Sequence, residues 1–141
     1  MKIYFGGSIS GGRGDQERYG QIIAYLKNFG EVLTEFIGNT SLSSLGEGNL
    51  DDKFIHDRDM EWLLKADVLI VEITTPSLGV GYEIGRALEN GKKILCLYRK
   101  IEGKRVSAMI KGAAGIEVCQ YGDLEELKGI VTVFFKKIKS A

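Results

Sequence analysis

The sequence predicts an α/β fold with a five-stranded parallel sheet, doubly wound and flavodoxin-like or Rossmann-like, in the strand order 2-1-3-4-5. Short apolar runs alternate with amphipathic segments along the whole chain, which is the pattern of strands joined by crossover helices. The length of 141 residues is that of one domain with a sizeable core. We therefore expect residues 1–141 to form a single domain.

Each expected strand is a short apolar run, and each expected helix carries apolar residues along one face. The predicted strands cover residues 2–6, 31–36, 67–72, 93–98 and 116–121. The predicted helices cover residues 15–29, 51–66, 79–90, 107–113 and 123–139. Gly30 and Gly91 follow two of these helices, and glycine is the common residue at a helix C-cap. Residues 38–48 show turn-forming composition without periodicity, and we consider them a candidate lid over a binding site.

Composition excludes several classes of partner. Nineteen basic residues balance nineteen acidic ones, so the chain has no basic surface for nucleic acid or for a membrane. The apolar run at the start is too short for a signal peptide and no later run would span a bilayer, so we expect a cytoplasmic protein. With one histidine, neither a zinc cluster nor a Ser-His-Asp triad is expected. Cys96 and Cys119 lie in apolar, strand-like contexts and are expected to be free thiols.

Residues 74–83, with the sequence TTPSLGVGYE, are the strongest candidate for a site. They join a buried strand to a helix, which is where open α/β sheets bind ligands. Glu83 shares a helix face with Val80, Ile84 and Ala87. We expect it in the first helical turn, where the helix dipole favours the ionised carboxylate by about 0.3–1 kcal/mol. Such a carboxylate is either a nucleophile or only a complement to the helix dipole.

The predicted strand order brings the turn after residue 5 beside the turn after residue 72. The first of these turns has the sequence GGSISGGRG, whose glycines would let the backbone approach an anion. Its spacing fits neither the dinucleotide fingerprint nor the Walker loop, so NAD, ATP and other cofactors are not expected. The turn either holds a single phosphate through its serines and Arg13 or is an ordinary connection.

Two more polar side chains lie on faces that are predicted to be buried. Asp59 falls on the apolar stripe of helix 51–66, where an acid needs a partner, a proton or a chemical role. Tyr4 lies in the first strand, and an ionised Glu83 would provide the partner that its hydroxyl needs. His56 is expected on the helix surface. Two acids and a phenol without metal ligands suit cleavage at an oxocarbenium-like centre, although a structural role for Asp59 is equally open.

Four blocks of sequence carry a resemblance to a known family. They are YFGGSI with GGR at residues 4–13, DMEWL with ADV at 59–68, PSLGVGYE at 76–83 and SAMI at 107–110. Together they resemble the 2′-deoxynucleoside 5′-monophosphate N-hydrolases, which belong to the nucleoside 2-deoxyribosyltransferase superfamily. The likeness extends from residue 3 to about residue 114, and the SLGVGYE block is specific.

The resemblance implies a reaction and a role for each catalytic residue. Glu83 would attack C1′ of the deoxyribose and form a covalent glycosyl-enzyme. Tyr4 would position Glu83, and Asp59 would hold the sugar or assist proton transfer to the departing base. Water would then release 2-deoxyribose 5-phosphate.

The resemblance also implies a phosphate site and a homodimer, because the serine of the SAMI block, Ser107, comes from the partner subunit in the family. The candidate substrate-binding residues are Gly7, Ser8, Ile9, Ser10, Gly11, Gly12, Arg13, Tyr19, Ser77, Gly79, Ser107, Ala108 and Met109. The chain departs from the family pattern at Ser10, where relatives have arginine, and at Phe36, where they have histidine. Serine cannot pair with phosphate bidentately, so the preference for nucleotides over nucleosides is expected to weaken unless Arg13 compensates.

Three alternatives stay open at this point. A deoxyribosyltransferase would pass the sugar to a second base, but the last residues, KKIKSA, offer no asparagine to complete a neighbouring site as in that branch. An N-glycosidase of ribonucleotides such as CMP is the second alternative. A nucleotide-binding module is the third, and it would have no need for an inward nucleophile such as Glu83.

Overall fold

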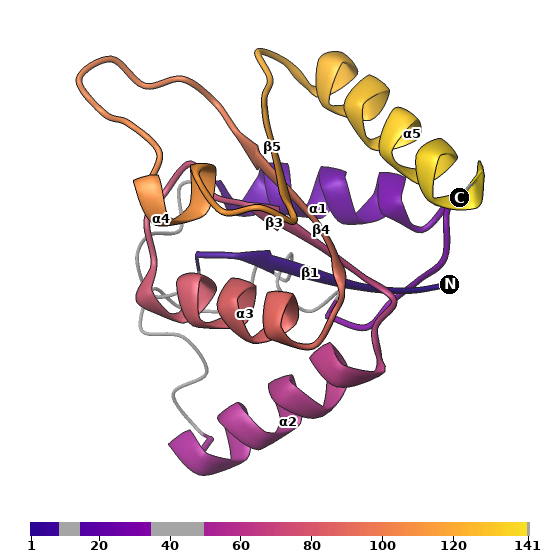
Figure 1. Ribbon diagram of the computed structural model, residues 1–141, viewed down its shortest axis with the longest axis vertical. Coiled ribbons are helices and arrows are strands. Elements are labelled where there is room, and N and C mark those ends of the chain that lie inside the picture. Colours follow the sequence, from indigo (N-terminus) through magenta and orange to yellow (C-terminus); the bar gives the residue numbers. More distant parts are fainter. Residues whose placement is uncertain (9–14, 35–49, 141) are drawn as a thin grey trace.

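The computed structural model shows a five-stranded, fully parallel sheet in the order β2-β1-β3-β4-β5, as predicted (Figure 1). The structure describes residues 1–8, 15–34 and 50–140. The strands are β1 (Lys2–Gly7), β2 (Glu31–Val32), β3 (Val68–Glu72), β4 (Lys93–Tyr98) and β5 (Ile116–Gln120). The helices are α1 (Gln16–Leu26), α2 (Asp52–Lys65), α3 (Leu78–Glu89), α4 (Ala108–Lys111) and α5 (Leu124–Ser140).

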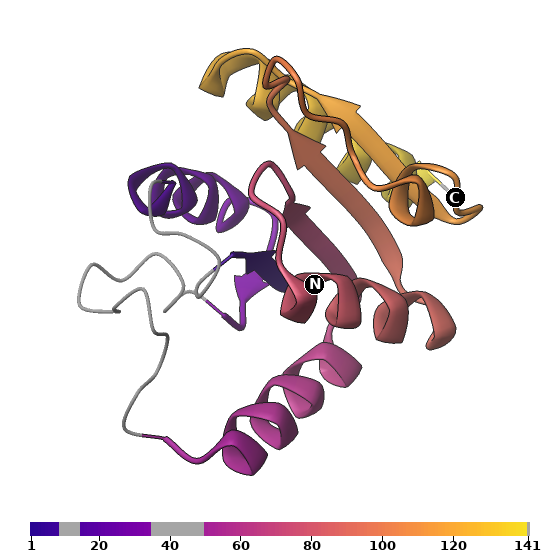
Figure 2. The same cartoon turned by 90° about the vertical axis from the view of Figure 1, so that its left-hand side faces the viewer.

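Helices cover both faces of the sheet, with α1 and α5 on one side and α2 and α3 on the other (Figures 1 and 2). Successive side chains of a strand point to opposite faces, so β1 contributes to two cores. Ile3 and Phe5 pack in the core under α1 and α5, whereas Tyr4 packs in the core under α2 and α3. Burial on both faces explains why the central strand β3 is almost continuously apolar.

Strand β2 is shorter than the predicted strand 31–36. Its ladder ends at Val32, and Leu33 and Thr34 form a turn. The Thr34 hydroxyl accepts a hydrogen bond from Phe5 N at 2.8 Å and donates one to Phe5 O at 2.7 Å. A side chain therefore takes the place that the backbone of β2 would have had, and strand periodicity alone does not reveal such a substitution.

The predicted C-cap at Gly30 is wrong, because α1 already ends at Leu26 with Lys27 as its cap. A Cβ at Gly30 would lie 2.2 Å from Met1 O, so glycine is needed there for close approach of the chain start. The prediction for Gly91 is confirmed. Gly91 has φ 71° directly after α3, a left-handed conformation that favours glycine at a helix end.

Each of the longer helices buries one face only. In α5 the buried side chains are Leu127, Val131, Phe134 and Phe135, and the opposite face carries lysines. In the parts of the chain that the structure describes, no helix combines the length and the apolar character needed to cross a bilayer. Cys96 is buried in β4 and Cys119 is half-buried in β5, and both are free thiols.

Candidate active site

The site forms where β1 and β3 end side by side. Gly7 at the end of β1 pairs with Glu72 at the end of β3, as the strand order predicts. The first loop and the connection 73–77 therefore begin at the same edge of the sheet. Residues 9–14 lie outside the described residues, and so do the predicted contacts of Ile9, Ser10, Gly11, Gly12 and Arg13. The candidate lid at 38–48 and Phe36 also lie outside them.

Helix α3 begins at Leu78, one residue earlier than predicted. Ser77 is the N-cap, and its Oγ accepts a hydrogen bond from Val80 N at 3.3 Å. The first turn of α3 contains no acid, so the prediction that Glu83 lies in that turn is wrong. Glu83 lies in the second turn, where the effect of the helix dipole is small.

Glu83 and Tyr4 form the centre of the site. The Tyr4 hydroxyl donates a hydrogen bond to Glu83 Oε2, as the sequence predicts. The Glu83 carboxylate also lies over the end of β1, since a Cβ placed on Gly6 would be 3.7 Å from Oε1. The pKa of the buried Tyr4 phenol is raised by desolvation and by the negative charge of Glu83, so the phenol stays a proton donor. A donor fixed on one oxygen restrains the orientation of the carboxylate.

Burial controls the ionisation of Glu83. Desolvation raises the pKa of Glu83 to about 7, the Tyr4 hydrogen bond lowers it, and the charge of Asp59 raises it. The expectation that the helix end favours the ionised form is therefore corrected, because removal from water is the largest effect here. A carboxylate that is weakly solvated and half ionised near neutral pH is a stronger nucleophile than a fully hydrated one.

Asp59 faces this pair from α2. Its side chain is 22% exposed, so it lies at the rim of the buried stripe rather than fully inside it. Arg58 is its partner, with Nε 3.0 Å and Nη2 2.9 Å from Asp59 Oδ1. The charge of Asp59 acts on both Glu83 and Tyr4. The structure thus brings Glu83, Asp59 and Tyr4 together, as predicted.

Arg58 is a member of this cluster that the sequence analysis missed. Its guanidinium lies 4.9 Å from the centre of the Trp62 ring and 5.8 Å from that of Phe54, so it is held by cation–π contacts as well as by Asp59. It lies off the apolar stripe of α2, and helical periodicity therefore assigns it to solvent. The signal in the sequence for including Arg58 was its position directly before Asp59.

The first loop leaves β1 over a buried tyrosine. A Cβ on Gly7 would lie 2.8 Å from Tyr19 Cζ, so the backbone passes directly over this ring. Ser8 N donates to the Tyr19 hydroxyl at 3.1 Å. The Ser8 hydroxyl is buried and has no hydrogen-bond partner among the residues that the structure describes, which is costly unless another group supplies one. Tyr19 supports the loop from below, and direct contact with a substrate stays a prediction for it.

Glu72 is a second residue that the sequence analysis missed. It ends the apolar strand β3 and is fully buried. It accepts from Thr74 N at 2.7 Å, from Thr74 Oγ1 at 3.0 Å and from the Tyr121 hydroxyl. Arg99 Nε lies 3.9 Å from its Oε2. The signal in the sequence was an acidic residue at the end of an apolar run. The role of Glu72 is to fix the connection that leads into α3.

The Ser107 block lies at the start of α4. Ser107 is the N-cap of α4 and accepts from Met109 N at 3.2 Å. Ser77 and Ser107 both line a cavity of about 930 Å³ between α3, α4 and the ends of β4 and β5. Met109 is 83% exposed and Ala108 is exposed. The contacts of Gly79, Ala108 and Met109 with a substrate stay predictions.

His56 is a surface residue, as predicted. Its Nε2 lies 2.7 Å from the Tyr82 hydroxyl, and its Nδ1 lies 2.9 Å from Asp57 Oδ1. Among the described residues there is no group of three or more His, Cys, Asp and Glu that could hold a metal ion. The chemistry that these side chains can perform is nucleophilic attack by Glu83, with Tyr4 and Asp59 beside it.

Fold and site together define a class of protein, a doubly wound α/β domain with a hydrogen-bonded carboxylate at the switch point of its sheet. Comparison with known sequences identifies the family within this class. The nucleoside 2-deoxyribosyltransferase family matches residues 3–123, and the chain belongs to this family.

Relatives cover nearly the whole chain. A protein of Esox lucius named 5-hydroxymethyl-dUMP N-hydrolase is 52% identical over 140 residues, which are 96% of this chain and 97% of that relative. A protein of Nematostella vectensis named putative 2′-deoxynucleoside 5′-phosphate N-hydrolase 1 is 57% identical over 114 residues, 79% of this chain and 77% of its own. The human protein named 5-hydroxymethyl-dUMP N-hydrolase is 50% identical over 125 residues, which are 88% of this chain and 72% of that relative.

Solved structures confirm the fold. The CMP N-glycosidase of Clostridium botulinum superimposes with a TM-score of 0.69 at 19% identity, covering 95% of this chain and 99% of its own. A 2-deoxyribosyltransferase of Bacillus psychrosaccharolyticus superimposes with a TM-score of 0.64 at 17% identity, and the match covers 91% of this chain and 90% of that protein. The predicted family and fold class are therefore both confirmed.

Proposed function

We propose that this protein hydrolyses the N-glycosidic bond of 2′-deoxynucleoside 5′-monophosphates to the free base and 2-deoxyribose 5-phosphate. The observation that supports this most directly is the hydrogen-bonded pair of Glu83 and Tyr4 beside Asp59, at the edge where open α/β sheets bind ligands. Relatives about half identical in sequence are named as N-hydrolases of such nucleotides. The protein is accordingly an N-glycosidase, and 5-hydroxymethyl-dUMP is the first substrate to test.

The reaction proceeds in two displacements. A Glu83 oxygen attacks C1′ of the sugar, the bond from C1′ to the base nitrogen breaks, and its electron pair leaves with the base. Asp59 assists the transfer of a proton to that base, and Tyr4 holds the other Glu83 oxygen by its hydrogen bond. Water then attacks C1′, and the bond between C1′ and the Glu83 oxygen breaks, which releases 2-deoxyribose 5-phosphate and regenerates the carboxylate. The proton that water loses replaces the one that Asp59 helped to deliver to the base. Water is the only co-reactant that this balance requires.

The start of the first loop supports a phosphate or sugar contact. Ser8, directly after β1, has a buried hydroxyl that contacts no hydrogen-bond partner within the described parts of the chain, and it lies at the edge of the sheet where β1 and β3 end. A hydroxyl in that position donates a hydrogen bond to an oxygen of the bound nucleotide, so that both groups have a partner. Because phosphate esters do not cross membranes unaided, we expect this substrate to be met in the cytoplasm.

A homodimer belongs to this proposal. Leu78 is 97% exposed, Met109 is 83% exposed and Tyr82 is 45% exposed, all near the starts of α3 and α4. Apolar side chains of this size at neighbouring positions fit an interface between two copies. Ser107 lies in the same region, so a second copy could receive it at its own phosphate site.

The decisive experiment measures release of free base by the wild type and by Glu83→Ala. The panel contains 2′-deoxynucleoside monophosphates, the matching deoxynucleosides and ribonucleotides. Release from deoxynucleotides alone, abolished in Glu83→Ala, is the expected result. Release only in the presence of an acceptor base would instead identify a deoxyribosyltransferase, and turnover of CMP would identify a ribonucleotide N-glycosidase. Binding without turnover would leave a nucleotide-binding module.

A further inference from the structure

A second polar cluster joins the ends of β3, β4 and β5 on the face of the sheet opposite to Glu83 and Tyr4. The side chain of Glu72 alternates with the β3 side chains that pack under α2 and α3. It therefore points to the face of α1 and α5, where Tyr121 is buried. The proposed chemistry uses none of these side chains, yet their contacts reach both loops that begin at this edge of the sheet.

The Glu72 carboxyl ties the connection 73–77 to β5. It accepts two hydrogen bonds from Thr74, one from the backbone N–H at 2.7 Å and one from the hydroxyl at 3.0 Å. It accepts another from the hydroxyl of Tyr121, directly after β5. Burial and this hydrogen bond raise the pKa of the Tyr121 phenol, so the phenol stays a donor. A fully buried carboxyl group needs such partners, and here they come from two segments far apart in the sequence.

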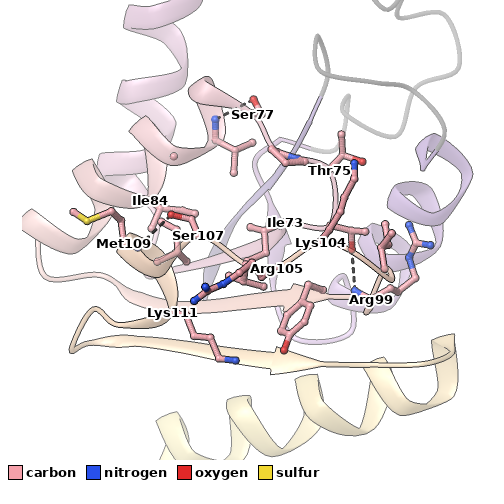
Figure 3. A pocket seen from close by; sticks show the side chains of 18 of the residues that line it. Ile73, Thr75, Ser77, Ile84, Arg99, Lys104, Arg105, Ser107, Met109 and Lys111 are labelled. Atoms are coloured by element: carbon pink, nitrogen blue, oxygen red, sulfur yellow. Dashed lines mark hydrogen bonds between the residues drawn. The ribbon is translucent and has the colours of Figure 1, made fainter.

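Arg99 connects this cluster to the start of α1. Its backbone N–H donates to Thr74 Oγ1 at 2.9 Å. Its Nε lies 3.9 Å from Glu72 Oε2, which is the distance of an ion pair rather than of a hydrogen bond. Its Nη2 donates to Asp15 Oδ1 at 2.6 Å. Figure 3 shows the Arg99 side chain at the edge of the cavity, directed toward α1 and away from Lys111.

Asp15 uses its carboxylate in a way that its position does not predict. It is the N-cap of α1, where an aspartate usually accepts a hydrogen bond from an N–H of the first helical turn. Its side chain forms no such bond to the described first turn, and its Oδ1 accepts from Arg99 instead. The start of α1 is thus held to the end of β4, through a carboxylate whose side chain is 14% exposed.

We propose that Glu72 and Arg99 are positioning residues for the proposed hydrolysis and that they couple the start of α1 to the connection 73–77. The proposal rests on the proposed function, because this connection ends at Ser77, the N-cap of α3, and α3 carries Glu83. A shift of the connection moves Glu83 relative to a substrate bound at the strand ends. A misplacement of about 1 Å can reduce a rate by about a hundredfold.

Two single variants and their combination test this coupling. Tyr121→Phe removes one hydrogen bond from Glu72 and adds no new group. Asp15→Ala removes the acceptor that holds Arg99, and it costs no cap bond to the first turn of α1. We would measure kcat and KM with 5-hydroxymethyl-dUMP as functions of pH, and amide exchange of Thr74 by NMR. Thermal unfolding checks that every variant is folded at the assay temperature.

Tyr25→Phe is the matched control for Tyr121→Phe. The Tyr25 hydroxyl lies 2.7 Å from Thr132 Oγ1 and joins α1 to α5. The control therefore removes a hydrogen-bonded phenol hydroxyl on the same face of the sheet, but near the C-terminal end of α1. We expect this variant to keep the kcat of the wild type and the slow exchange of the amide at position 74.

We expect each single variant to lower kcat about tenfold, because a hydrogen bond of the cluster is lost, with a smaller change in KM. The acid limb of the pH profile should stay in place, since neither Asp15 nor Tyr121 is among the groups that shift the pKa of Glu83. The double variant should be little slower than the slower single variant, because members of one network have non-additive effects. The Thr74 N–H should exchange about tenfold faster in both single variants.

Three results would overturn the proposal. They are unchanged kcat in the single variants, additive effects in the double variant, and slow exchange of Thr74 in Asp15→Ala. An equal loss of kcat in Tyr25→Phe would also count against it, because that loss would reflect packing in general. Amide exchange does not depend on turnover. Absence of base release by the wild type would therefore refute the proposed function, while exchange of Thr74 would still decide whether α1 and the connection are coupled.

Discussion

At the scale of single residues, the site rests on the balance of effects that act on Glu83. Burial raises the pKa of this carboxyl from 4.5 to about 7, and the charge of Asp59 acts in the same direction, whereas the Tyr4 hydroxyl acts against both. Between these two pKa values the folded chain holds a proton that the unfolded chain has lost. The contribution of Glu83 to stability therefore falls as the pH rises from about 4.5 to about 7. Activity follows the opposite course, because the nucleophile must be ionised.

Tyr4→Phe removes the hydrogen bond that stabilises the ionised carboxylate. We expect the pKa of Glu83 to rise by roughly one to two units, since a hydrogen bond to a charged group contributes about 1.5–3 kcal/mol. The acid limb of kcat/KM against pH, expected near pH 7 in the wild type, should move to higher pH by the same amount. An unmoved limb with a lower plateau would show that Tyr4 acts on the substrate instead.

Asp59→Asn should move the same limb the other way. Removing the negative charge beside Glu83 eliminates one of the causes that raise its pKa, so the carboxylate ionises at lower pH. The plateau is expected to fall as well, because proton transfer to the base loses its assistant. The pH profile of Arg58→Gln is the matched control, since this change leaves the charge of Asp59 in place but removes its partner. An acid limb at higher pH in Asp59→Asn would contradict the assignment.

At the scale of elements, the ends of strands and helices decide where the site residues lie. Periodicity predicted all five strands and their order, because burial of both sheet faces leaves a strong apolar signal. It could not predict contacts made by single polar atoms. The Thr34 hydroxyl replaces the backbone of β2, and the Ser77 hydroxyl caps α3, in which Glu83 lies in the second turn. Arg58 was missed because it lies off the apolar face of α2. Glu72 was missed because one of its partners, Tyr121, is distant in sequence.

The turn at Gly7 gives a test at this scale. Gly7→Ala would place a methyl group 2.8 Å from the ring of Tyr19, which is buried and cannot move aside freely. We expect a loss of about 1–3 kcal/mol of stability from overpacking, together with weaker nucleotide binding because the first loop shifts. The measurement is chemical denaturation.

Gly85→Ala is the control for this variant. It lies in the exposed part of α3 with nothing within 4 Å of the added methyl group, so it should stabilise the helix by about 1 kcal/mol. Equal effects of the two substitutions would show that the tyrosine ring does not restrict the loop.

At the scale of the whole molecule, the candidate catalytic residues and Ser107 lie on different elements of one chain. Glu83, Tyr4 and Asp59 lie together near the end of β1, whereas Ser107 lies across the cavity beside β4 and β5. The sequence resemblance assigned Ser107 to the neighbouring subunit, and a single chain does not test that assignment. Periodicity and motifs therefore do not decide whether one chain or two chains build one site.

Mixing two inactive variants decides between one chain and two. Glu83→Ala lacks the nucleophile and Ser107→Ala lacks the hydroxyl, and each pure variant is expected to be weakly active or inactive. If Ser107 serves the neighbouring site of a two-fold dimer, a mixed dimer contains one intact site, formed by Glu83 of one copy and Ser107 of the other. Random re-association of equal amounts gives half mixed dimers, so about one quarter of the wild-type activity should return. If Ser107 serves its own chain, no combination restores a site and the mixture stays as inactive as its parts.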